Sequence, residues 1–110
     1  MIKLAQQVMF LDYECDVHIH EYASNKQSAI ELIIADTEHN QGRMSEPGEP
    51  MCMATVCLPG YPFEKRETAI KDYSENRGVL QSLVNAGIIA PTGKSTNSGF
   101  VEIPIVRFTI

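Results

Sequence analysis

The pattern of hydrophobic and polar positions predicts a protein built mainly of β-strands. In residues 8–22 apolar and polar side chains alternate with a period of two, which places successive side chains on opposite faces of a strand. One face of this strand would carry Leu11, Tyr13, Cys15, Val17 and Ile19, and the other would carry Asp12, Glu14, Asp16, His18, His20 and Tyr22. The first strand is therefore expected to have one buried and one hydrated face.

A second strand is predicted over the more apolar residues 29–35, after a turn at residues 24–26, so that the first two strands form a hairpin. Residues 36–50 are polar and collect two glycines and two prolines, which interrupt strand pairing and favour turns. This segment is expected to be the longest loop.

The pattern in the second half of the chain predicts three more strands. Strand character returns at residues 51–58 and, over a short stretch, at residues 68–73. Residues 91–99 are expected to form a polar turn, and residues 100–110 a last strand whose Pro104 favours an edge position or a bulge.

One helix is predicted near residues 75–86. Val79, Leu80, Leu83 and Val84 recur at helical spacing, Ser74 can cap the helix start, and Gly87 can end it in a left-handed conformation. The element order is then β-β-β-β-α-β. It predicts a single α+β domain over residues 1–110, an antiparallel sheet of about five strands with the helix packed on one face.

The acidic composition excludes two classes of binding partner. A net charge of −5 and a pI near 5.1 oppose direct binding to nucleic acid or to an anionic membrane, because both require clustered positive charge. No stretch approaches the roughly 20 apolar residues that span a bilayer. Three cysteines at loose spacing are not a disulfide framework. The expected location is the cytoplasm.

Candidate chemistry is sparse. Residues 91–96 resemble the end of a phosphate-binding loop, but they follow a helix and lead into a strand, the reverse of the required context. The cysteines lie in apolar stretches, where a thiol is less reactive. His18 and His20 share a strand face at a spacing that suits two ligands of one metal, so a metal-dependent enzyme remains an alternative. We otherwise expect no catalytic residues, no cofactor and no bound metal.

Two groups of carboxylates are the best candidates for a binding surface. Asp12, Glu14 and Asp16 would repeat about every 7 Å along the first strand, a spacing comparable to that of nucleic-acid phosphates. A second group, made of Asp36, Glu38, Glu46 and Glu49, lies in the long loop. Such a surface could occupy the basic channel of a protein that binds nucleic acid. The alternative is a solvated strand face that is charged to prevent edge pairing.

Three segments carry a family resemblance. The sequences at residues 54–59, 70–76 and 98–104, above all the Lys-Asp-Tyr-Ser-Glu-Asn block that begins at Lys71, resemble a small family of uncharacterised proteins carried on bacterial plasmids and conjugative elements. The resemblance covers mainly residues 54–104 and implies a genomic setting, without an activity.

Small acidic proteins on mobile elements often disable host defences by stoichiometric binding. We therefore expect a non-enzymatic inhibitor of a CRISPR or restriction system, whose partner is a host protein or ribonucleoprotein complex. The alternative is an accessory protein of plasmid maintenance or transfer, which could form a homodimer through an exposed sheet edge.

Overall fold

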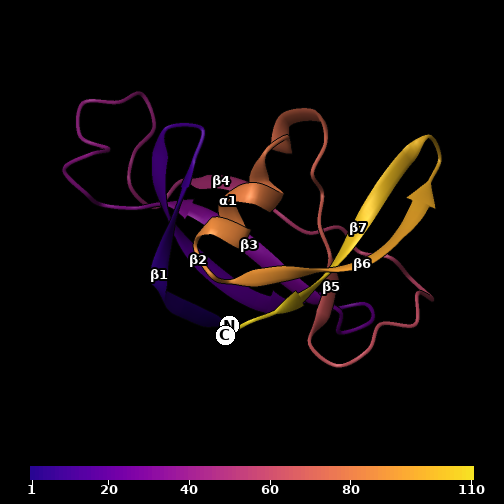
Figure 1. The fold of residues 1–110 in the computed structure, drawn as a ribbon. Helices are drawn as coiled ribbons and strands as arrows, with labels where there is room; N and C mark the ends of the chain where they lie inside the picture. Colours follow the sequence, from indigo (N-terminus) through magenta and orange to yellow (C-terminus); the bar gives the residue numbers. More distant parts are fainter.

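Two antiparallel sheets and one short helix make up the fold in the computed structural model, which describes residues 1–110 (Figure 1). The four-stranded sheet has the order β1-β2-β3-β4 and contains β1 (Ile2–Phe10), β2 (Tyr13–Glu21), β3 (Ser28–Ile34) and β4 (Pro50–Met53). The three-stranded sheet has the order β5-β7-β6 and contains β5 (Glu67–Ala69), β7 (Val101–Phe108) and β6 (Ile89–Ser98). The α+β class is confirmed, whereas the prediction of one five-stranded sheet is wrong.

The predicted first strand, residues 8–22, is interrupted by a turn and comprises the end of β1, that turn and β2. Leu11 and Asp12 form the turn, both with positive φ values of 49° and 68°, and Phe10 pairs with Tyr13 across it. A two-residue loop with two positive φ values is a type I′ turn, for which Asn-Gly is the usual sequence. Since Leu-Asp carries no such signal, the turn was not predicted, and β1 was missed with it.

The second hairpin follows the prediction more closely. A turn leads into β3, and the long loop between β3 and β4 is confirmed. The strand predicted at residues 51–58 ends early, at Met53, and only an isolated bridge between Thr55 and Ile70 continues the pairing. The strand predicted at residues 68–73 is reduced to β5.

The helix α1 (Val79–Asn85) is shorter than predicted and begins after Gly78. Ser74 instead starts a 3₁₀ turn (Ser74–Asn76), and Asp72 Oδ1 accepts the N–H groups of Gly78 and Leu80 at 3.0 and 3.1 Å. The predicted end of the helix is confirmed. Gly87 has φ of +75° and donates to the carbonyl of Val84 at 3.0 Å, and Ile88 donates to Leu83 at 3.1 Å, which is a Schellman motif.

Residues 91–98 of the predicted polar turn belong to β6 and are strand, and only Gly99 lies in a turn. β6 and β7 form a long hairpin that projects from the body of the molecule (Figure 1). Pro104 lies in β7, the central strand of its sheet, opposite Ser95, where the register of β6 shifts. The bulge lies in β6, opposite Pro104, and the predicted edge position of Pro104 is wrong.

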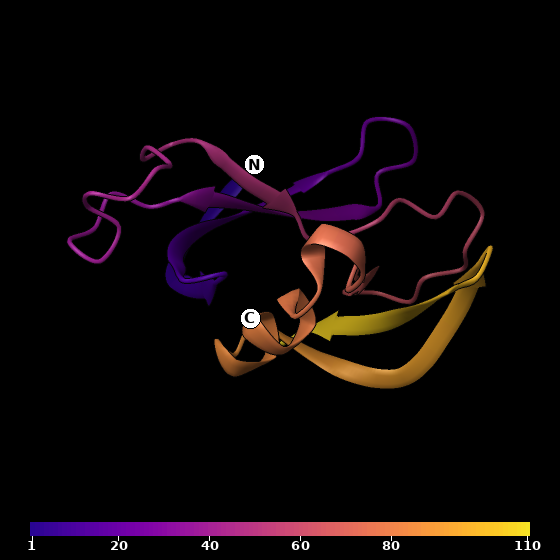
Figure 2. The same ribbon diagram turned by 90° about the horizontal axis from the view of Figure 1, so that it is seen from above.

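The four-stranded sheet forms one layer, and α1 with the three-stranded sheet forms the other (Figure 2). The main core lies between them and is made of buried side chains from both layers: Val8, Phe10, Cys15, Val17, Ile30, Leu32, Ala54, Ile70, Val79, Leu83, Ile88, Ile89, Val106 and Phe108. α1 packs against β1 and β6 and so joins the two layers. No helix is long and apolar enough to cross a bilayer.

Candidate functional site

The long loop lies beside the β1–β2 turn at one end of the molecule, and both views place it opposite the β6–β7 hairpin tip (Figures 1 and 2). Five exposed carboxylates gather there: Asp12 in the turn, and Asp36, Glu38, Glu46 and Glu49 in the loop. We call this group the acidic end. Arg43 is the only Lys or Arg in the β1–β2 turn and the long loop. The five carboxylates and Arg43 together carry a net charge of −4, against −5 for the whole chain.

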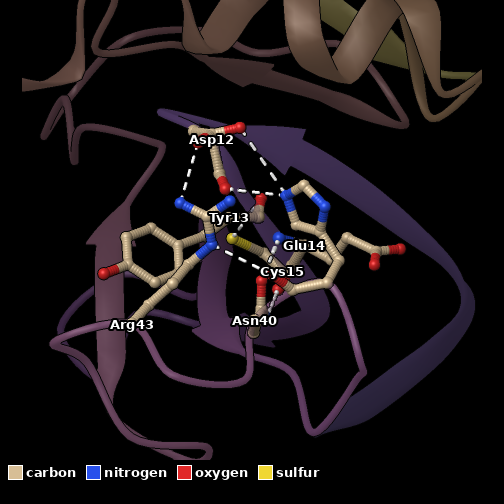
Figure 3. Close-up of polar contacts among 7 residues, drawn as sticks. Asp12, Tyr13, Glu14, Cys15, Asn40 and Arg43 are labelled. Carbon is tan, nitrogen blue, oxygen red and sulfur yellow. Dashed lines mark hydrogen bonds and ion pairs between the residues drawn. The ribbon is translucent and has the colours of Figure 1, made fainter.

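Asn40 fastens the loop to the sheet (Figure 3). The residue is almost fully buried, at 4% exposed. The amide oxygen accepts the N–H of Glu14 at 3.0 Å, and the amide nitrogen donates to the carbonyls of Glu14 and Ala35, both at 2.8 Å. The amide thus completes backbone hydrogen bonds at the start of β2 and the end of β3, and so fixes the loop against the strands that carry the core.

A second set of contacts joins the loop to the β1–β2 turn. Arg43 Nη1 donates to Asp12 Oδ2 at 2.8 Å (Figure 3), and His39 Nε2 donates to the carbonyl of Asp12 at 2.9 Å. The guanidinium of Arg43 also lies over the ring of Tyr13, 5.6 Å from its centroid. The pairing leaves the Asp12 side chain 70% exposed, so its carboxylate still faces solvent.

The predicted row of carboxylates along one strand is not formed. Asp12 lies in the turn, and only Glu14 and Asp16 lie on β2. Asp16 is 18% exposed and is paired with Lys3 at 3.6 Å and with the amide of Gln7 at 3.0 Å. Its charge is therefore satisfied within the sheet. The structure brings Asp12 together with the loop carboxylates instead.

The loop carboxylates differ in whether they are already bound within the chain. Glu49 Oε1 accepts the N–H of Glu46 at 3.0 Å and so supports the loop backbone. The side chains of Asp36, Glu38 and Glu46 form no ion pair or hydrogen bond with the rest of the chain. The loop also surrounds a hollow of about 310 Å³ that no hydrophobic residue lines. This surface offers charge and hydrogen-bonding groups to a partner.

His18 and His20 lie on the outer face of the four-stranded sheet, as the alternation predicted. His20 Nε2 is 3.7 Å from Glu31 Oε1 on the neighbouring strand. No group of three or more His, Cys, Asp or Glu side chains is placed to hold a metal ion. The metal-dependent enzyme remains a prediction from the spacing of the two histidines alone.

The other sequence candidates have structural roles. Burial raises the pKa of the Cys15 thiol to about 12 and that of Cys52 to about 11, which keeps both thiols protonated at neutral pH. Lys94, from the segment that resembles a phosphate-binding loop, forms an ion pair with the buried carboxylate of Glu67 at 2.7 Å. The thiols of Cys15 and Cys52 are therefore weak nucleophiles at neutral pH, and the Lys94 ammonium is paired within the chain.

Three important residues of the site, His39, Asn40 and Arg43, were not predicted. Asn40 bonds to Glu14, which is 26 positions away, and Arg43 bonds to Asp12 across 31 positions. An asparagine and an arginine within a polar loop look like ordinary solvated side chains, so the sequence contains no local signal for these contacts.

The comparisons with known proteins give no relative. No family model, no curated protein and no solved structure matches the chain.

Proposed function

We propose that the protein is a non-enzymatic inhibitor that binds a nucleic-acid-binding effector of a bacterial host defence, of the CRISPR or restriction type, through its acidic end. The observation that carries the proposal is the attachment of an acidic loop to the sheet by the buried Asn40 side chain. A flexible acidic loop would lose conformational entropy on binding, whereas a loop held in place loses less.

Charge complementarity supports this class of partner. Proteins that bind nucleic acid carry basic channels, and a concentrated negative surface both attracts and occupies such a channel. The acidic end and Arg43 hold most of the net charge of the chain, so the molecule is electrically asymmetric. Residues 54–104 are predicted from the sequence to be related to proteins of mobile elements, and that prediction favours a role against a host defence.

A pair of charge-reversal variants tests the proposal in cells. Glu38→Lys with Glu46→Lys alters two loop carboxylates that have no partner within the chain, and Glu21→Lys with Glu102→Lys alters two exposed carboxylates outside the acidic end. Each Glu→Lys change removes one negative charge and adds one positive charge, so both double variants have the same net charge. The first is expected to weaken binding about tenfold or more, because like charges then face each other, and the second is not.

The readout is the transformation efficiency of a targeted plasmid in bacteria that carry an active CRISPR or restriction system and express each form of the protein. Wild type and the Glu21/Glu102 variant should raise transformation, and the Glu38/Glu46 variant should not. If wild type gives no protection against a panel of such systems, the proposed inhibitor function is wrong. Equal protection by both double variants would exclude the acidic end as the binding surface.

A second candidate function is an oligomeric accessory protein of plasmid maintenance or transfer. Two observations favour it: β1 is an edge strand of its sheet, and Ile2 and Met9 on that strand are exposed. An unpaired edge can pair with the same strand of another copy. Sedimentation that shows a stable dimer in the absence of any host protein would favour this function over inhibition.

A further inference from the structure

We infer that Leu11, together with Met44, forms an apolar anchor within the acidic end, and that the partner is a protein with an apolar pocket surrounded by basic residues. This inference rests on the proposed function and adds the chemistry of the partner surface. The apolar anchor distinguishes a protein partner with an apolar pocket from a partner that binds by charge alone. A uniformly basic surface has no pocket for two exposed apolar side chains.

Leu11 is in an unfavourable position for its residue type. It occupies the first central position of the type I′ turn with φ of 49°, where asparagine is preferred and a branched side chain is strained. The residue is 58% exposed, so the core does not require a leucine there either. Neither the turn geometry nor the packing of this chain accounts for a leucine there. Contact with a partner does.

Met44 is held beside the same turn. It is 98% exposed, yet both of its chain neighbours are fixed on β2 or the turn. Arg43 binds the Asp12 carboxylate, and the N–H of Ser45 donates to Tyr13 Oη at 3.4 Å. Met44 is therefore presented at a defined place, because its neighbour Arg43 is paired with Asp12, the residue that follows Leu11 in the turn. A flexible thioether side chain adapts readily to a pocket.

The surrounding charge identifies the partner. The two apolar residues lie among the carboxylates of the acidic end, so a matching surface is apolar at its centre and basic around it. Anionic membranes and bare nucleic acid do not meet the second condition. Phe100, at the tip of the β6–β7 hairpin, is also fully exposed but lies at the opposite end of the molecule, which makes it a suitable control position.

Two synthetic peptides of equal length and charge serve as probes: one alternates lysine with leucine, the other lysine with serine. Titrated into ¹⁵N-labelled protein, the Lys-Leu peptide is expected to bind about tenfold more tightly, because it buries an apolar side chain of leucine size, and to shift the amide signals of Leu11 and Met44. Leu11→Asn should reduce its affinity to that of the Lys-Ser peptide. Phe100→Ser should leave both affinities unchanged.

Loss of binding in Leu11→Asn cannot be attributed to unfolding, because asparagine suits the turn better than leucine. The midpoint of thermal unfolding is expected to rise by roughly 4 °C. Equal affinity of the two peptides, absence of binding by both, or binding that maps to Phe100 would each overturn the apolar anchor. In the plasmid assay, full protection by Leu11→Asn with none by the Glu38/Glu46 variant would refute the anchor and leave the proposed inhibitor function intact.

Discussion

Replacement of Asn40 by alanine is expected to lower the free energy of unfolding by about 3 kcal/mol and to release the long loop from β2. The change removes three hydrogen bonds, each to a backbone group of Glu14 or Ala35. Alanine cannot replace any of them, and water has little access because the side chain is buried. Each backbone group that loses its partner adds to the cost.

Denaturant unfolding measures the loss of stability, and amide hydrogen exchange measures the release of the loop. The matched control is Gln41→Ala, which alters an exposed neighbour in the same loop and should change stability by no more than about 0.5 kcal/mol. Faster exchange of the Glu14 amide is expected only in the Asn40 variant. If both variants unfold at the same denaturant concentration, Asn40 does not fasten the loop.

Leu83→Ala is expected to have a similarly large effect, about 3 kcal/mol, for a different reason. Leu83 is completely buried in the main core, on a helix of only seven residues. So short a helix is not stable alone, and packing holds it in place. Because α1 packs against both β1 and β6, a cavity at Leu83 weakens the attachment of the two layers to each other.

Thermal or denaturant unfolding measures this effect, with Gln81→Ala on the exposed side of the same helix as the control. The control removes a hydrogen bond to Asn85 within the helix and should cost about 0.5 kcal/mol or less. A loss below 1 kcal/mol in Leu83→Ala would contradict the joining role of α1, since large-to-small changes in a packed core cost about 2 to 5 kcal/mol.

The parts of the fold that the sequence predicted are those that depend on neighbouring residues. The apolar run of β3, the glycine- and proline-rich loop and the helix end at Gly87 were all recognisable, because spacing and turn residues determine them locally. The Leu11–Asp12 turn could not be predicted, since its residues are unfavourable there. β6 was predicted to be a turn because its residues are mostly polar. It is an edge strand, and polar side chains are hydrated there.

The sequence predicted the negative charge of the candidate site but not the arrangement of its residues. The carboxylates of the long loop could be identified from composition, but the residues that position them could not. Asn40 and Arg43 act through contacts with β2 and the β1–β2 turn, and such contacts depend on how the chain folds back on itself. Asp16 was predicted to belong to the binding surface and does not. It is paired with Lys3 and Gln7 on the neighbouring strand β1, so its carboxylate is not free to bind a partner.

The most direct test of the central claim is a titration of the purified effector that the plasmid assay identifies, with inhibition of its DNA binding as the readout. A non-enzymatic inhibitor that binds through the acidic end should reach full inhibition near one protein per effector. Inhibition should weaken as salt is raised, and the Glu38/Glu46 variant should not inhibit. Complete inactivation at a small fraction of that ratio, persisting after the protein is removed, would mean that it acts as an enzyme and would contradict the account.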